Sequence, residues 1–264
     1  MPKNMSGQII FAVLTFVFCN LALAMDINDE ALVAYWSFDE GQGKIIHDSS
    51  QNKLDGELKG DTKWVDGKYG KAIELHSGKD YFVAGNNQAF GLAEVSMTLW
   101  MYPYVIGASK GGASMIASDV IWQSSLDYGF HWWTAGGVGW YLWIPSIKGV
   151  EISVTTPNKW YFVAGTYDGT TGTLYVNDQK KSDAFPAHTA QGSRPFYTGG
   201  ETCAPAGWGC SGGWYEGIID EITLFNRSLT EDEVKEIMNG ALAGTKAIVT
   251  SGKLTATWGE LKSK

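Results

Sequence analysis

A strand that runs directly into a capped helix near the end of the chain constrains the fold more than any other feature. Residues 217–225 alternate along an extended strand, and this alternation predicts that Asp220 and Glu221 point to opposite faces. Thr230 follows closely, and Glu233 stands three positions later, which is the spacing of a helix capping box. The apolar residues that come next recur at helical spacing. The sequence therefore predicts a last strand followed by one short helix.

Composition favours an all-β protein with one sizeable core. The chain has 264 residues, of which 33 are glycine and 12 are tryptophan, and aromatic residues make up 13%. Glycine supplies turns, and aromatic side chains favour pleated, half-buried strands. Short alternating segments recur between Gly- and Asp-containing turns, at residues 33–38, 70–75, 80–84, 95–102, 160–167 and 172–177. This spacing predicts a two-sheet antiparallel sandwich.

Six motifs also stand in the order found in a known family. They are Tyr35–Gly41, Asp48–Ser50, Gly70–Leu75 with Asp80–Tyr81, Met97–Met101, Trp160–Gly169 with Leu174–Asn177, and the closing strand and helix. Together they resemble the laminin-G-like jelly-roll domains of the concanavalin A-like lectin/glucanase superfamily, over roughly residues 31–240. The resemblance implies a two-sheet antiparallel jelly-roll β-sandwich with one short C-terminal helix. It also implies a binding role, which this fold serves with many different ligands.

The N-terminus is typical of a secretory signal peptide. Lys3 supplies a positive charge, residues 9–24 are almost wholly apolar, and Ala22–Ala24 forms a small-x-small cleavage pattern. The apolar run is shorter than the roughly 20 residues that span a bilayer, so cleavage is favoured over an uncleaved anchor. We expect the mature chain to be secreted or held in the cell envelope, with no membrane span.

Export changes how the cysteines are interpreted. Removal of the signal peptide takes away Cys19 and leaves Cys203 and Cys210 in a Gly-rich segment. In an exported chain this pair predicts a local disulfide. Metal binding by the pair is the weaker alternative, because no histidine or second cysteine pair stands nearby in the sequence.

Three parts of the chain follow from these signals. We expect a signal peptide over residues 1–24, a jelly-roll domain over residues 25–240 and a C-terminal extension over residues 241–264. The extension lies beyond the family resemblance, and its alternatives are an added strand and a flexible tail.

Two function classes are disfavoured by the sequence. The net charge of −8 comes without a basic run, so nucleic acid is not an expected partner. Glycoside hydrolases need two carboxylates facing one sugar, and no strand carries same-face acidic spacing. Nucleophile-elbow and zinc-helix motifs are also missing from the sequence. We therefore expect a protein that is not an enzyme, and a glycoside hydrolase is the least favoured alternative.

The aromatic segment 122–144 is the best candidate for a ligand site. Alternation assigns its apolar faces to the core, namely Tyr128, Phe130 and Trp132 on one strand and Trp140, Leu142 and Ile144 on the next. The outward face is left with Trp133, Tyr141 and Trp143, together with His131. Exposed rings stack on the apolar face of a sugar while polar neighbours fix its hydroxyls. The alternative is cross-strand aromatic pairing that only stabilises the hairpin.

A cation site is implied by the resemblance. Related jelly rolls often bind one Ca²⁺ where the first and last strands run side by side, and Ca²⁺ takes six to eight oxygen ligands. Asp39 after the first strand and Asp220 in the last strand match acidic positions of the family motifs. We expect these two residues as calcium ligands. The alternative is that Asp39 opens a turn and Asp220 hydrogen-bonds the loops around it.

Two functions of different kinds remain. The first is an exported, non-catalytic carbohydrate-binding module, stabilised by calcium. The second is a protein–protein or cell-surface adhesion module that uses the same aromatic residues as an interface. A cleft with convergent polar groups favours a glycan, whereas a flat apolar patch favours a cell-surface protein.

Overall fold

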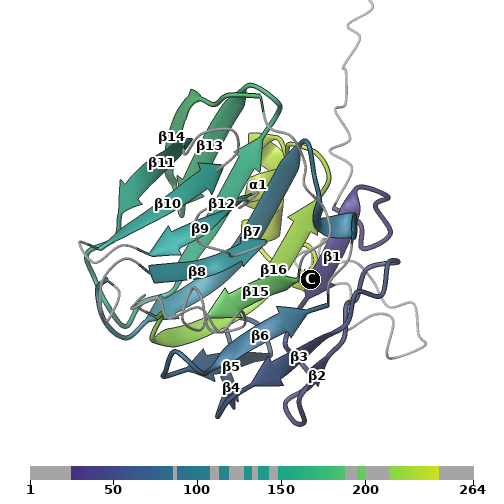
Figure 1. The fold of residues 1–264 in the computed structure, drawn as a ribbon, viewed down its shortest axis with the longest axis vertical. Coiled ribbons are helices and arrows are strands. Elements are labelled where there is room, and N and C mark those ends of the chain that lie inside the picture. The colour runs from purple at the N-terminus through teal and green to yellow at the C-terminus, as the bar shows by residue number, and fades with distance from the viewer. Residues whose placement is uncertain are drawn as a thin grey trace, which may run out of the picture.

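Two antiparallel eight-stranded sheets pack face to face in the computed structural model of the chain (Figure 1). The structure describes residues 25–85, 88–107, 113–118, 128–132, 136–142, 148–187, 195–199 and 214–243. Within these residues the all-β sandwich with one short C-terminal helix is confirmed. No helix in these ranges is long and apolar enough to cross a membrane.

Sheet A contains the closing strand. Its order is β14 (Gln179–Ala184), β13 (Thr171–Val176), β12 (Tyr161–Tyr167), β7 (Val95–Pro103), β16 (Gly217–Phe225), β5 (Lys71–Leu75) and β4 (Lys63–Asp66). The first strand, β1 (Leu32–Trp36), also pairs with β16, beside its second half. β1 and β5 therefore share one edge of β16, so the first and last strands run side by side as expected.

Sheet B contains the aromatic hairpin. Its order is β11 (Lys148–Ser153), β10 (Gly137–Leu142), β9 (Tyr128–Trp132), β8 (Ala113–Ser118), β15 (Phe196–Gly199), β6 (Tyr81–Ala84), β3 (Gly56–Lys59) and β2 (Ile45–Ile46). A short 3₁₀ helix, η1 (Gln88–Phe90), precedes β7.

The core lies between the sheets and follows the predicted alternation. The inward residues of β9 and β10 are fully buried, namely Tyr128, Phe130, Trp132, Trp140 and Leu142. Trp36 from sheet A is also fully buried and meets Phe82 and Phe196 of sheet B at ring-centroid distances of 5.2 and 4.9 Å. Large rings from both sheets thus fill the gap, and burial of such rings removes a large apolar area from water.

The predicted alternation in the last strand is wrong at one place. The register of β16 shifts between Asp220 and Thr223, and Glu221 has a positive φ of 55°. Such a β-bulge adds a residue, so the alternation restarts after it. Ile219 and Ile222 both face the core as a result. Asp220 and Glu221 do not point to opposite faces: Asp220 accepts a hydrogen bond from the Tyr69 amide, and Glu221 accepts one from Tyr35 and lines a cavity with Tyr69.

The helix α1 (Glu231–Met238) covers part of the outer face of sheet A (Figure 1). The predicted capping box is confirmed, because the Glu233 amide donates to Thr230 Oγ1 at 3.3 Å and the Thr230 amide donates to Glu233 Oε2 at 2.7 Å. Val234 and Ile237 are buried against sheet A. Leu242 is buried in the same cluster, so the packed part of the chain extends past residue 240.

Candidate functional site

Tyr141 lies flat on the outer face of sheet B. Trp140 and Leu142, which precede and follow Tyr141 in the sequence, are buried in the core, so the Tyr141 side chain points to the outer face. Its partner in β11 is Gly149, where a Cβ atom would clash with the Tyr141 ring. The hydroxyl of Tyr141 donates a hydrogen bond to Glu151 Oε1. The ring is thus supported from below by bare backbone, held at its tip, and still partly exposed.

His131 stands beside this ring. Its ring centroid lies 5.3 Å from that of Tyr141, with the two planes tilted by 43°. Burial lowers the pKa of His131 to about 4, so the imidazole is neutral at pH 7. A neutral imidazole carries one donor and one acceptor nitrogen, which is the complement that a sugar hydroxyl can use.

Several residues next to Tyr141 and His131 in the neighbouring strands are glycines. The register places Gly129 and Gly149 on either side of Tyr141, and Gly139 beside His131. Glycine weakens a strand, and inside a strand it often marks a place where a ligand approaches the backbone. The outer face of β9, β10 and β11 therefore combines two rings with glycines, of which Gly149 is partly exposed and Gly129 and Gly139 are buried. The other predicted members of this surface, Trp133 and Trp143, lie outside the described residues, as do Cys203 and Cys210.

Asp220 occupies a buried position at the bulge of β16. Its Oδ2 accepts hydrogen bonds from the Lys68 amide at 2.8 Å and the Tyr69 amide at 3.1 Å. Its Oδ1 is buried and accepts no hydrogen bond from the described residues. Burial, followed by the neighbouring charge of Glu221, raises the pKa of Asp220 to about 9.

Asp39 reaches the same turn from the other side. Its Oδ1 accepts a hydrogen bond from the Lys71 amide at 2.9 Å, and its negative charge acts on Asp220. The structure thus brings both sequence-predicted acids to the β4–β5 turn, residues 67–71. Hydrogen bonding to surrounding loops, the alternative role for Asp220, is what the amide contacts show.

Gly67 in this turn packs tightly against oxygen atoms. A Cβ atom built on Gly67 would lie 2.5 Å from Asp220 Oδ2 and 2.9 Å from the carbonyl oxygens of Tyr69 and Lys71. These three oxygens therefore leave no space for a side chain at residue 67. No cluster of three or more His, Cys, Asp or Glu side chains suited to a metal occurs in the described ranges, so backbone carbonyls would have to supply ligands.

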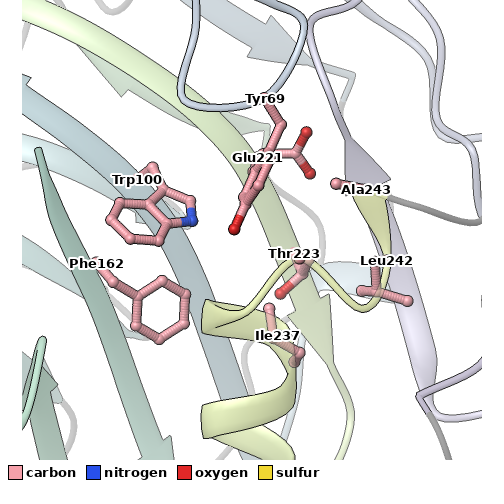
Figure 2. Close-up of a pocket in the computed structure, with 9 residues that line it drawn as sticks. Tyr69, Trp100, Phe162, Glu221, Thr223, Ile237, Leu242 and Ala243 are labelled. Carbon is pink, nitrogen blue, oxygen red and sulfur yellow. The ribbon is translucent and has the colours of Figure 1, made fainter. Parts of the chain in front are cut away.

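A small cavity lies between sheet A and α1. Figure 2 shows Trp100 and Phe162 on one side, Glu221 and Thr223 on β16, and Ile237 of the helix. Its volume is about 10 Å³, the space of one water molecule. Glu221 there accepts a hydrogen bond from the hydroxyl of Tyr35, and burial raises the Tyr35 pKa well above its usual value. The cavity is part of the packing and is too small for an organic ligand.

Sequence reasoning missed Gly149 and Glu151, because β11 was not predicted as a strand. The pattern of residues 148–153 contains the signal, since Val150 and Ile152 alternate with outward residues and both are buried. Trp100, which was assigned to the core or its rim, is buried, and Trp160 packs beside it half-buried.

Comparison with solved structures shows the same fold. Domain 4 of AbnA, a GH43 extracellular arabinanase from Geobacillus stearothermophilus solved with arabinotriose, superposes with a TM-score of 0.59 at 19% identity, covering 78% of this chain and 97% of that domain. The binding domain of botulinum neurotoxin DC with SialylT gives 0.61 at 13% identity, over 82% of this chain and 52% of that one. Trypanosoma rangeli sialidase with sialic acid gives 0.63 at 14% identity, over 82% and 34%. The chain thus spans only about half of the toxin binding domain and a third of the sialidase.

The sequence comparison agrees with the structural one. No protein of curated function matches the chain. A family profile described as the concanavalin A-like lectin/glucanases superfamily matches residues 76–235, which is more than half of the sequence. The chain belongs to the concanavalin A-like lectin/glucanase superfamily.

Proposed function

We propose that this protein is an exported, non-catalytic carbohydrate-binding module whose ligand site is the outer face of sheet B around Tyr141. The observation that carries the proposal is the Tyr141 ring, laid over Gly149 and held by Glu151. A flat ring with an accessible face stacks on the C–H face of a sugar. Glu151 stands at the tip of the ring, where it can bind a hydroxyl, and the predicted site residue His131 lies beside the ring with its Nδ1 buried. The arabinotriose complex of the arabinanase domain and the SialylT complex of the toxin binding domain support a glycan as ligand class.

The placement of carboxylates supports a binding role over a catalytic one. Among the described strands, the register puts Glu151 of β11 and Glu57 of β3 on the outer face of sheet B. These strands are six interstrand spacings apart, or about 29 Å. Glycoside hydrolysis needs two carboxyl groups within about 5–9.5 Å of each other.

Glycan-array binding of the mature chain, followed by calorimetric titration of the hits, tests the proposal. Tyr141→Ala is expected to weaken binding at least tenfold, because the stacking platform is lost. Tyr102→Ala is the matched control, since Tyr102 is a half-buried tyrosine on the outer face of the opposite sheet. Trp143→Ala tests the extension of the same surface that the sequence predicts. Folded protein that binds no glycan would favour the adhesion-module alternative.

A calcium ion at the β4–β5 turn is part of the proposal. Asp220, whose buried Oδ1 accepts no hydrogen bond from the described residues, and Asp39, whose negative charge acts on Asp220, would supply hard oxygen ligands, with backbone carbonyl oxygens completing the set. The ion would lock the turn between the first and last strands. Melting curves in Ca²⁺ and in EDTA test this: Ca²⁺ is expected to raise the melting temperature of the wild type but not that of Asp220→Asn. An equal response of both proteins would exclude this site.

Export belongs to the same proposal. Cleavage after residue 24 and a Cys203–Cys210 disulfide are expected in the mature chain, secreted or in the cell envelope. Intact-mass measurement of the exported protein, before and after reduction, tests both features at once.

A further inference from the structure

A second pair of aromatic rings lies on the outer face of sheet B, away from Tyr141. Tyr197 of β15 and Tyr81 of β6 point away from the core, because Phe196 and Phe82 next to them are fully buried. Their ring centroids are 6.2 Å apart, with planes tilted by 59°, and both side chains are partly exposed. Neither residue was among the predicted ligand-site residues.

One transverse row joins the two aromatic positions. The register pairs residues strand by strand from β11 to β2, in the order Gly149, Tyr141, Gly129, Ala117, Tyr197, Val83, Glu57 and Ile45. Residues in register point to the same face of a sheet. Tyr141 and Tyr197 are therefore on one face, and only Gly129 and Ala117, the two smallest residue types, stand between them.

The spacing sets the size of a ligand that contacts both rings. Three interstrand spacings separate Tyr141 from Tyr197, which is about 14 Å. One sugar residue of an extended chain advances by about one interstrand spacing, so about four residues are needed to contact both rings.

The charged side chains near this row indicate whether a neutral or an acidic glycan can bind. Glu151 lies toward one end of the row, and its negative charge repels an acidic glycan. Lys59, the cation beside Tyr81 in the register, has its Nζ 2.6 Å from Glu57 Oε2 and is therefore already paired. The described part of this face thus offers flat rings and hydrogen-bonding groups rather than a counter-ion for a carboxylate or sulfate.

We infer that the outer face of sheet B binds a linear, neutral oligosaccharide laid across the strands, with Tyr197 and Tyr81 as a second contact beyond Tyr141. The inference rests on the proposed function, because Tyr141 supplies the first contact. It adds a minimum ligand length and a charge class, which the Tyr141 site alone does not set.

Calorimetric titration with cello-, laminari-, xylo- and arabino-oligosaccharides of increasing length tests the inference. For the series that binds, affinity is expected to rise about tenfold between the disaccharide and the tetrasaccharide and then to level off. Tyr197→Ala should remove this increase and leave disaccharide binding unchanged, whereas Tyr141→Ala should weaken binding of every length. Tyr102→Ala, on the opposite sheet, should match the wild type.

The possible outcomes separate the two proposals. Binding that does not strengthen beyond the disaccharide, or that Tyr197→Ala weakens equally at every length, would overturn the second contact and leave the Tyr141 site standing. Equal or tighter binding of oligogalacturonates would overturn the neutral class. No binding of any length by folded protein would overturn the proposed function together with the inference. Tyr81→Ala gives an independent variant if Tyr197→Ala fails to fold.

Discussion

The outer faces of the two sheets differ in how far their side chains are enclosed. On sheet A, α1 and the bulge of β16 enclose Glu221 and Asp220, and buried polar groups there bind one another and the backbone. On sheet B, Tyr141 rests on Gly149 and stays partly exposed, with His131 beside it. Polar groups on the first face are enclosed by the fold, whereas the Tyr141 side chain on the second is partly exposed. The proposed function assigns stability to the first face and binding to the second.

Titration distinguishes the same two faces. Burial disfavours the charged form of any group, so it raises the pKa of Asp220 to about 9 and lowers that of His131 to about 4. Without a bound ion both groups are neutral at pH 7, but Asp220 gains its charge as pH rises and His131 gains its charge as pH falls. A rise in pH is therefore expected to destabilise sheet A through Asp220, whereas a fall in pH is expected to destabilise sheet B through His131.

The largest expected effect is on sheet A. Asp220→Ala, measured by denaturant unfolding in EDTA, should lower the free energy of unfolding by about 3 kcal/mol. The substitution leaves the buried amides of Lys68 and Tyr69 without their acceptor, and each such loss costs about 1–3 kcal/mol. Glycan affinity should be unchanged, because Asp220 is on the other sheet. A loss of glycan affinity by folded Asp220→Ala protein would contradict the assignment of binding to sheet B alone.

Asp220→Asn is the matched control because it keeps an acceptor oxygen. The folded wild type holds a proton on Asp220 between about pH 4 and pH 9 that the unfolded chain has lost. Its stability in EDTA should therefore fall as pH rises through this window, by up to about 1.4 kcal/mol per pH unit. The asparagine variant should lack this contribution, and an unchanged slope would contradict a raised pKa at Asp220.

A smaller effect of opposite sign is expected from sheet B. The unfolded chain protonates His131 below about pH 6.5, whereas the folded chain resists protonation down to about pH 4. Stability from this group is complete above pH 6.5 and is lost as pH falls, by up to about 2 kcal/mol at pH 5. Unfolding of the wild type and of His131→Phe at pH 7 and pH 5 measures the difference. Equal acid sensitivity of the two proteins would show that His131 is not buried in its neutral form.

Gly149→Ala should separate binding from stability. Its Cβ would clash with the Tyr141 ring and lift it from the strand. We expect glycan affinity to fall about tenfold, while the free energy of unfolding changes by less than about 1 kcal/mol. Gly85→Ala is the control, because a Cβ there meets nothing within 4 Å. Unchanged glycan affinity in Gly149→Ala would show that binding does not depend on the Tyr141 ring resting on Gly149.

Much of this comparison was predictable from the sequence. Alternation in 128–132 and 137–142 gives the core and outward faces correctly, since five large inward side chains fully determine the register. The capping box at Thr230 is local and is likewise confirmed. The six ordered motifs predicted the fold, because five of them contain strands of the sandwich and Asp48–Ser50 is a loop between strands.

The remainder depends on contacts between distant segments. The bulge at Asp220 leaves no local mark, since Asp-Glu fits an alternating strand, and only pairing of β16 with β1, β5 and β7 requires the extra residue. The row from Tyr141 to Tyr197 depends on the order of strands in sheet B, which no single segment encodes. Sequence patterns therefore predict which face of a strand a side chain is on, whereas the order of strands in the folded sheets decides which side chains lie next to one another.

The smallest expected effect is that of a single oxygen atom. Tyr141→Phe keeps the ring over Gly149 and removes only the hydrogen bond to Glu151. If stacking dominates, affinity should fall only about two- to threefold, far less than in Tyr141→Ala, and stability should be unchanged because the bond is exposed. Calorimetry on the two variants with the same oligosaccharide measures the ratio. An equal loss in both would mean that the hydroxyl and Glu151, rather than the ring face, recognise the sugar.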